Sequence, residues 1–580
     1  RQAVTVSQAL YINGAGEKCY TMPEWIKGSN TRIPLLVAAE VVSNPIWLAI
    51  KSMPYLSSQE NPSTLYLANQ LYVNSLGLDI LENIDVLDNL DNIDILEGGV
   101  SRLKMNEDVK QTLLEATPWV RDVLAEEEQM AAVKNYFDKE RIASELQKTS
   151  NELTNRQNGD GGWNWMPDGK SSLWITQQVL KKVKGGSIKV KEALAYVDKE
   201  QQRHYERYIK PYLKKGYNWE PTDIDYLYTR TFYGKATTEA YKYYYANALK
   251  NYKHFENLYT QAQLALVFHR HGDRKQALDL LHRIKEKALV NDEMGMYWRD
   301  NRSGPFWYQR PIETQALLIQ AFAEITPDDT ETIGLMQQWL LKQKQTTHWG
   351  NERATTEAIK ALTVESENGK VKSETKAAVQ MTVFGEPMSG EVKGMEGYQS
   401  QRWTGTALDS LQSLGSSDIV IRKQDDGIAW GAVYYQFTDD MDSIPSSDMG
   451  ITVRRSYHNL SNTGEQNILR VGDKVKVRID ITCDRTMEYL ELIDGRPSCV
   501  EPLTTRAGWR WNDGLSYYIV VGNTDTRCYI DHLDKGRYYF EYEVYVTNPG
   551  HFLSGPVTMQ CMYAPEFRAT APAQSLDVVE

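Results

Sequence analysis

Alternation of apolar and polar residues marks both ends of the chain as β-structure. Near the start, Ala3–Val6 and Leu35–Val42 are rich in β-branched residues and are flanked by Gly, Asn and Pro, which predicts strands. Beyond residue 365 the same signal returns, because Lys474–Ile481 alternates strictly and Tyr538–Val546 is an aromatic and β-branched run. Turn residues separate several such runs, which is typical of a β-sandwich.

Between these ends the apolar spacing is that of helices. The stretches Ile46–Met53, Ser63–Leu76 and Asp108–Leu124 fit the helical period, and the pattern continues to about Val364. Short turns that carry Gly, Pro or Asn interrupt it, as at His269–Asp273. This spacing predicts stacked antiparallel helix pairs.

A turn that contains Trp recurs in the helical region. Gly161–Trp165, Met296–Trp298 and His348–Gly350 each precede a predicted helix with a Thr near its start. Recurrence of one such unit is typical of a solenoid or of a closed α/α toroid. We expect these tryptophans to lie at the toroid rim, where they anchor loops or, alternatively, offer a surface on which a ligand stacks. The residues are Trp163, Trp165, Trp298 and Trp349.

The order of β, α and β segments predicts an insertion. A few N-terminal strands cannot form a stable sheet alone, so we assign residues 1–43 to the same β-domain as residues 366–445. The helical domain, residues 44–365, then lies within that β-domain, and residues 446–580 form a second β-sandwich. The fold class is therefore multidomain, with separate α and β parts.

Charge and hydropathy exclude several classes of protein. The chain has 65 basic and 77 acidic residues, a net charge of −12 and a mean hydropathy of −0.53. An acidic chain repels phosphates, so we expect no nucleic acid as partner. No apolar run approaches the ~18 residues of a membrane helix, so we expect no membrane-spanning segment. Because the chain begins with Arg1 and has no leader, we interpret it as a processed product or a fragment.

The five cysteines support neither a zinc ribbon nor a redox motif. Cys19 stands alone, and the other four fall in the last hundred residues without any C-x-x-C spacing. Whether Cys483, Cys499, Cys528 and Cys561 pair with one another stays open.

Catalytic motifs are missing from the sequence. It contains no H-E-x-x-H, G-x-S-x-G or G-x-G-x-x-G. A zinc-dependent toroid enzyme would need a cysteine ligand, and residues 44–365 contain none. An acid-dependent cyclase would need an acidic cluster, for which Asp223 and Asp225 are the nearest candidates, but Tyr226 follows them. We therefore predict no catalytic residue, no metal site and no cofactor.

Residues 78–97 carry an acid at every third position, from Asp79 to Glu97. A period of three drifts around a helix, so no fixed apolar face results. The central Gly of a calcium-binding loop is absent, and we assign no site to this segment.

Seven short strings, spread over nearly the whole chain, carry a resemblance to a known family. They are Asn44–Trp47 (NPIW), Met53–Leu56 (MPYL), Leu113–Val120 (LLEATPWV), Asn158–Trp163 (NGDGGW), Asp225–Arg230 (DYLYTR), Trp511–Tyr518 (WNDGLSYY) and Met562–Phe567 (MYAPEF). With them the chain resembles the C-terminal part of bacterial alpha-2-macroglobulin family proteins, of the type found in Bacteroidetes. The resemblance implies a split CUB-like β-domain around a helical thioester-type toroid, followed by a macroglobulin-like, receptor-binding-type β-sandwich.

The resemblance also locates a lost reactive motif. Fully active members of the family trap proteases and acylate them through a Cys–Gln thioester in a C-x-E-Q motif. Aligned from Met53–Leu56, that motif falls on Ser63–Tyr66, where Ser63 replaces the cysteine, Leu65 the glutamate and Tyr66 the glutamine. Since no cysteine lies between residues 20 and 482, a shift of the alignment would not restore it. Ser63 also fits a helix N-cap.

From this resemblance we expect a non-enzymatic relative of the endopeptidase inhibitors that acts without a thioester. It would trap its target sterically or conformationally, or bind another envelope component. Expected partners are proteases or other envelope proteins, with a larger polypeptide upstream of Arg1. The expected location is extracytoplasmic, in the bacterial periplasm or at the outer-membrane surface. The alternatives are an envelope binding or adhesion module, whose aromatic toroid surface binds a peptide or glycan, and an α/α-toroid enzyme.

Overall fold

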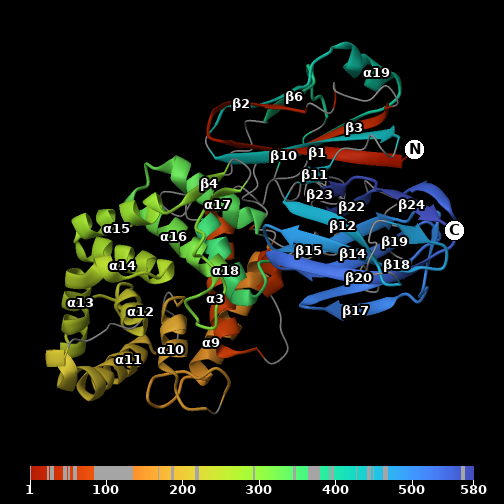
Figure 1. The fold of residues 1–580 in the computed structure, drawn as a ribbon. Coiled ribbons are helices and arrows are strands. Elements are labelled where there is room, and N and C mark those ends of the chain that lie inside the picture. Colours follow the sequence, from red (N-terminus) through yellow and green to blue (C-terminus); the bar gives the residue numbers. More distant parts are fainter. Residues whose placement is uncertain are drawn as a thin grey trace. The chain divides into compact units, whose positions relative to one another are not determined.

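The computed structural model places most of the 580 residues. The described residues are 2–22, 25, 32–43, 49, 52–56, 62–83, 135–167, 169–183, 188–215, 221–291, 294–343, 348–363, 379–390, 392, 397–425, 427–440, 446–448, 450–461, 468–562 and 568–580. They fall into two compact units, one made from both ends of the chain and one from its middle. Figure 1 shows the strands of the ends in red, teal and blue and the helices of the middle in red-orange to green.

The first and last parts of the split β-domain share their sheets. One sheet has the order β1-β10-β3-β8 and the other β2-β9-β6-β7. The strands are β1 (Gln2–Asn13), β2 (Gly16–Thr21), β3 (Ile33–Val42), β6 (Gln380–Val383), β7 (Glu386–Pro387), β8 (Tyr398–Trp403), β9 (Asp418–Lys423) and β10 (Ile428–Asp439), with helix α19 (Thr406–Ser413) before β9. In Figure 1 the red β1 lies beside the teal β10. The predicted insertion of the helical domain into this CUB-like β-domain is therefore confirmed.

The core of this β-domain draws on both halves of the chain. Leu10 and Val37 from the first segment are buried with Trp403, Ile421 and Phe437 from the second. Burial of these side chains gives the N-terminal strands the apolar contacts that they lack alone.

The helices of the middle unit form two concentric layers. In the described part of the chain the inner layer has six helices: α3 (Thr64–Asn83), α10 (Leu173–Leu180), α12 (Pro221–Arg230), α14 (Leu258–His271), α16 (Pro311–Ile325) and α18 (Glu352–Leu362). Each packs against the next, and α18 packs against α3, so the ring closes. The outer helices are α9 (Lys139–Asn155), α11 (Val190–His204), α13 (Glu239–Asn251), α15 (Arg274–Glu286) and α17 (Thr330–Lys342). The predicted α/α toroid is confirmed.

The pattern of buried residues along a helix distinguishes the outer layer from the inner layer. The outer helix α15 buries one stripe, Ala277, Leu280, Leu281 and Ile284, which has the spacing of a helix with one solvent face. The inner helix α14 buries every residue from Leu258 to Phe268. An inner helix has neighbours all round, so its polar residues must find partners inside the toroid.

The C-terminal sandwich has a seven-stranded sheet, β11-β23-β22-β15-β19-β18-β17, a four-stranded sheet, β12-β14-β20-β16, and a three-stranded sheet, β13-β24-β21. Its longer strands are β12 (Ile451–Asn459), β14 (Lys474–Cys483), β15 (Met487–Gly495), β18 (Leu515–Val521), β19 (Asp525–Leu533) and β20 (Gly536–Val546). The shorter ones are β11 (Ser447–Asp448), β13 (Leu469–Arg470), β16 (Val500–Pro502), β17 (Gly508–Asn512), β21 (Gly550–Leu553), β22 (Val557–Cys561), β23 (Arg568–Ala571) and β24 (Ser575–Val579). Val475, Val477, Ile479 and Ile481 of β14 are buried, as the alternation predicts.

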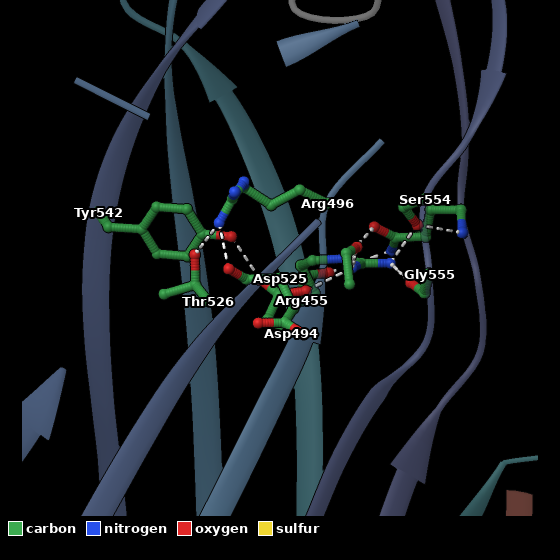
Figure 2. Close-up of polar contacts among 10 residues, drawn as sticks. Arg455, Asp494, Arg496, Asp525, Thr526, Tyr542, Ser554 and Gly555 are labelled. Carbon is green, nitrogen blue, oxygen red and sulfur yellow. Dashed lines mark hydrogen bonds and ion pairs between the residues drawn. The ribbon is translucent and has the colours of Figure 1, made fainter. Parts of the chain in front are cut away.

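A buried ion pair joins two sheets of this sandwich (Figure 2). Arg455 on β12 donates to Asp494 Oδ1 on β15 at 2.5 Å, and to the carbonyls of Gly495 at 3.1 Å and Gly555 at 2.9 Å. It also donates to Ser554 Oγ. A guanidinium has five donors in a fixed plane, so this set of acceptors fixes β12 against the end of β15 and the segment that leads into β22.

Tyr542 on β20 completes the pair, since its hydroxyl donates to Asp494 Oδ2 at 2.7 Å. Both oxygens of the carboxylate thus have a donor. Arg496 lies next to this group and donates to Thr526 Oγ1 at 2.8 Å, which ties the end of β15 to the start of β19 (Figure 2).

Two predicted segments are only partly covered by the structure. Leu78–Asn83, the start of the acidic triplets, continues helix α3, whereas residues 84–97 lie outside the described residues. The helix predicted at Asp108–Leu124 and most of Ile46–Met53 also lie outside them.

Replacing Asp494 by Asn should lower the stability of the C-terminal sandwich. Because Arg455 would keep a buried charge without a counter-ion, we expect a loss of about 3–5 kcal/mol in the free energy of unfolding. Urea denaturation, with hydrogen exchange read in β12 and β15, measures this. The control is Asp480→Asn, which removes an exposed partner of Arg478 and should cost less than about 1 kcal/mol. Equal effects of the two changes would contradict the role given to Asp494.

Candidate functional site

The position predicted for the lost C-x-E-Q motif lies at the start of inner helix α3. Ser63 Oγ accepts the backbone N–H of Tyr66 at 3.1 Å, and the Ser63 carbonyl accepts the N–H of Leu67 at 3.1 Å. Ser63 is thus the N-cap of α3. Its hydroxyl satisfies a helix terminus, and no described base contacts it.

The other two replaced positions face the interior. Leu65 and Tyr66 are both buried. Burial, and then the negative charges that Tyr55 and Glu352 can carry, raise the pKa of Tyr66 to about 12. The Tyr66 phenol therefore stays protonated at neutral pH and is a poor nucleophile. Where a thioester would need a thiol and a carboxamide, this chain has a hydroxyl cap and packed rings.

Around this helix start the surface is partly aromatic. The ring of Tyr55 stacks on His348 with centroids 4.0 Å apart. The carbonyl of Trp165 accepts the N–H of Thr64 at 2.9 Å, which holds the Trp165 loop against α3. Trp165 is 46% exposed, and Met166 beside it is also exposed.

The other three predicted rim tryptophans are buried. Each indole N–H donates to a carbonyl in the last turn of the preceding outer helix. Trp163 bonds Leu153 of α9 at 2.7 Å, Trp298 bonds Ile284 of α15 at 2.8 Å, and Trp349 bonds Leu340 of α17 at 2.7 Å. The carbonyls of Ile284 and Leu340 also accept the backbone N–H of the C-cap residue, Lys287 and Gln343, both at 3.2 Å, so the indole is a second donor to the end of these helices.

Two of these Trp-bearing turns also form a hydrogen bond to the inner helix that follows. The backbone N–H of Trp163 donates to Thr176 Oγ1 of α10, and that of Trp349 to Thr355 Oγ1 of α18, both at 3.0 Å. The recurrent Trp and Thr therefore join the end of an outer helix to the start of the next inner one. Of the four predicted surface tryptophans only Trp165 offers its ring to a ligand.

Sequence reasoning missed a second aromatic group, which sits on the first turns of the inner helices. Trp307, in the loop before α16, has its ring centroid 6.2 Å from Trp174 of α10 and 5.7 Å from Tyr259 of α14. Its carbonyl accepts from Arg353 Nη1 of α18 at 3.2 Å, and the Arg353 guanidinium lies over the Trp174 ring. Trp174, Tyr259 and Arg353 are each the second residue of their helix. This shared position, read from the sequence, could have indicated that the three side chains lie at the same end of the toroid. We call these four residues the mouth cluster.

Deeper in the toroid, polar residues of different inner helices pair with one another. Lys181 Nζ lies 2.5 Å from Asp225 Oδ1, which also accepts from Gln263 Nε2 at 2.7 Å. Asp225, the acid singled out in the sequence, is thus held by two donors. Lys182 forms an ion pair with Glu357.

The charges around Glu357 set its ionisation. Burial disfavours the carboxylate, but Lys182 and Lys360 outweigh burial and lower the pKa of Glu357 to about 2. Burial lowers the pKa of Lys360 to about 8, although Glu357 opposes that change. The Glu357 carboxylate is therefore ion-paired with Lys182 and also attracts the ammonium group of Lys360.

Among the residues that the structure describes, no three His, Cys, Asp or Glu side chains come together as a metal site would require. In the same part of the chain, no helix combines the length and apolar character needed to cross a membrane.

Comparison with protein families supports the resemblance. Residues 450–566, the C-terminal sandwich, match the family described as Bacterial Alpha-2-macroglobulin MG10 domain. No curated protein sequence matches the chain.

One solved structure shares the fold at low identity, and two others match with lower TM-scores. The chain is similar to trypsin-activated alpha-2-macroglobulin from Escherichia coli, with 13% identity, coverage of 100% of this chain and 36% of that one, and a TM-score of 0.50. It is also similar to the native protein of that organism from domain MG7 to the C-terminus, with 14% identity, coverage of 100% and 82%, and a TM-score of 0.38. The Salmonella protein reacted with methylamine has 12% identity, coverage of 100% and 34%, and a TM-score of 0.36. The chain thus spans about a third of the length of the whole proteins. The family match and the shared fold confirm the resemblance stated from the sequence.

Replacing Trp349 by Ala should destabilise the toroid. The change removes a buried ring and the donor for the last turn of α17, so we expect a loss of about 3–5 kcal/mol in the free energy of unfolding. Chemical denaturation followed by circular dichroism at 222 nm measures it. Trp165→Ala is the matched control, because that ring is exposed and its removal should stay within about 0.5 kcal/mol. A stable Trp349→Ala protein would contradict the capping role.

Replacing Glu357 by Gln should change how stability depends on pH. The folded protein lowers the pKa of Glu357 from its ordinary value of 4.5 to about 2, so the carboxylate stabilises the fold above pH 4.5 and loses that effect as the pH falls toward 2. At pH 7 we expect the variant to be less stable by about 3 kcal/mol, and the difference should shrink below pH 4.5. Urea denaturation from pH 2 to 7 tests this. The exposed Glu286→Gln change serves as control, and a difference that persists at pH 2 would rule out the pairing.

Proposed function

We propose that this alpha-2-macroglobulin family chain belongs to a non-enzymatic protein that restrains endopeptidases without forming a covalent bond to them. The observation that supports it is the start of α3, where Ser63 caps the helix and Leu65 and Tyr66 are buried. The toroid that relatives use to carry a reactive acyl group is retained, while the side chains needed to make that group are absent. Trapping would then be steric or conformational.

No other cysteine in the chain supplies the missing thiol. Cys19 is exposed on strand β2 of the split β-domain, a different element from the toroid. The remaining four are buried in the C-terminal sandwich, where burial raises the pKa of Cys483 to about 12. A thiol with such a pKa is neither nucleophilic nor easily acylated at neutral pH.

The chain spans about a third of the whole protein to which it is similar, so we propose the activity for a larger protein. We propose that the target is held by the assembled protein, with further domains upstream of Arg1, and that it acts outside the cytoplasm, in the periplasm or at the outer-membrane surface. The proposed partners are proteases or other envelope proteins.

A second candidate is an envelope binding or adhesion module. The exposed Trp165 and the half-buried Trp174 and Trp307 favour it, because partly exposed aromatic rings bind peptides and glycans. In this case the protein would retain a ligand without slowing any protease.

Trapping can be measured with the full-length protein and a panel of endopeptidases. We expect hydrolysis of a large protein substrate to fall severalfold, while hydrolysis of a small chromogenic peptide continues, because a caged protease remains active. The trapping proposal is wrong if no endopeptidase loses activity toward the large substrate, and the binding-module reading then takes its place.

Methylamine provides the control for covalency. It opens thioesters by forming an amide, so we expect neither a mass increase nor a mobility shift on treatment, and no covalent protease complex in denaturing gels. An adduct on any residue would show that a thioester forms in spite of Ser63.

A further inference from the structure

The loop that carries Trp307 differs in charge from the chain as a whole. We call Arg299–Arg310 the mouth loop. It has three arginines, Arg299, Arg302 and Arg310, and one acid, Asp300, in a chain whose net charge is −12. Arg299 and Arg302 are exposed, and neither forms an ion pair with a residue that the structure describes. The loop is therefore a local positive surface on an acidic protein.

Hydrogen bonds within the loop hold its shape. The N–H of Gly304 donates to the carbonyl of Gln309 at 3.1 Å, and the N–H of Gln309 donates to the carbonyl of Phe306 at 3.0 Å. Arg310 Nη1 donates to the carbonyl of Gly304 at 2.7 Å. A loop closed in this way loses little conformational entropy when a partner binds.

Trp307 anchors the loop, while Phe306 beside it is exposed and Tyr308 is half-buried. The Trp307 ring contacts Trp174 and Tyr259 of the mouth cluster. Phe306 is 53% exposed, and its ring is parallel to that of Tyr308 with centroids 5.4 Å apart. The loop thus carries an exposed aromatic ring together with the two exposed arginines.

We propose that the mouth loop binds an acidic, aromatic-containing segment of a partner polypeptide. The guanidinium groups of Arg299 and Arg302 pair with carboxylates in a bidentate manner, while Phe306 and Tyr308 pack against the apolar side chains of the same segment. The inference rests on the proposed function, since it names the chemistry by which the toroid would hold a partner in place of an acyl bond.

The test uses this 580-residue chain and three synthetic 12-residue peptides with the same phenylalanine positions. The polar positions are Glu in the first peptide, Gln in the second and Lys in the third. Binding is measured by isothermal titration calorimetry at 50 and 300 mM NaCl. We expect the Glu peptide to bind at least tenfold more tightly than the Gln peptide, no binding of the Lys peptide, and a weaker affinity at the higher salt.

Two variants locate the contact. Arg302→Glu and Phe306→Ala should each weaken the Glu peptide at least fivefold, whereas Arg203→Glu, an exposed change on outer helix α11, should leave it unchanged. Since Arg302 and Phe306 are exposed, circular dichroism should show all variants folded. Equal affinity for the three peptides, or for the wild type and the Arg302→Glu and Phe306→Ala variants, overturns the proposal.

Polygalacturonate serves as a polyanionic glycan probe. If it binds with the same dependence on Arg302 and Phe306 while the Glu peptide does not, the partner is a glycan and the polypeptide assignment is wrong. The peptide measurement involves no protease, so a failure of trapping in the full-length protein contradicts the proposed function alone. A failure of peptide binding contradicts this inference alone.

Discussion

An inner helix of the toroid has no solvent face, and most features of the middle unit follow from that constraint. Once α18 packs against α3, each inner helix is surrounded by two inner neighbours and the outer layer. Several polar side chains pair across the ring: Lys181, the C-cap of α10, and Gln263 of α14 both bond Asp225 of α12. Such pairs are costly to leave incomplete, so they select one arrangement of the helices among many apolar packings.

The same constraint accounts for the side chains found at the position predicted for the C-x-E-Q motif. The first turn of α3 is needed to close the ring, whether or not it carries chemistry. Ser63 provides a cap, and Tyr66 fills space beneath Tyr55 and next to α18. The replaced positions have thus become ordinary parts of a helix start.

The architecture could be predicted from the sequence, because it depends on the hydrophobic period of each segment and on the order of the segments along the chain. The strict alternation of β14, the helical spacing from Ser63 onward and the recurrence of Trp before Thr all correspond to observed elements. Sequence reasoning could not separate Trp163 from Trp165, two residues apart, of which one is buried and the other exposed. That difference depends on where α9 ends in space, since the Trp163 indole reaches a carbonyl of its last turn. The mouth cluster was missed for a similar reason: its members are distant in sequence, and only ring closure brings Trp174, Tyr259 and Arg353 around Trp307.

The pairing of β1 with β10 has a consequence for how the protein is made. Gln2 lies opposite Asp439, so the first strand waits for a partner translated more than 400 residues later. At about 5–20 residues per second, that delay is roughly 20–90 s. The toroid, whose helices contact near neighbours in the chain, can fold within that time, whereas β1 and β3 expose unpaired edges throughout it. Biogenesis of this protein therefore requires that its N-terminal strands be shielded until the last part of the same sheet emerges.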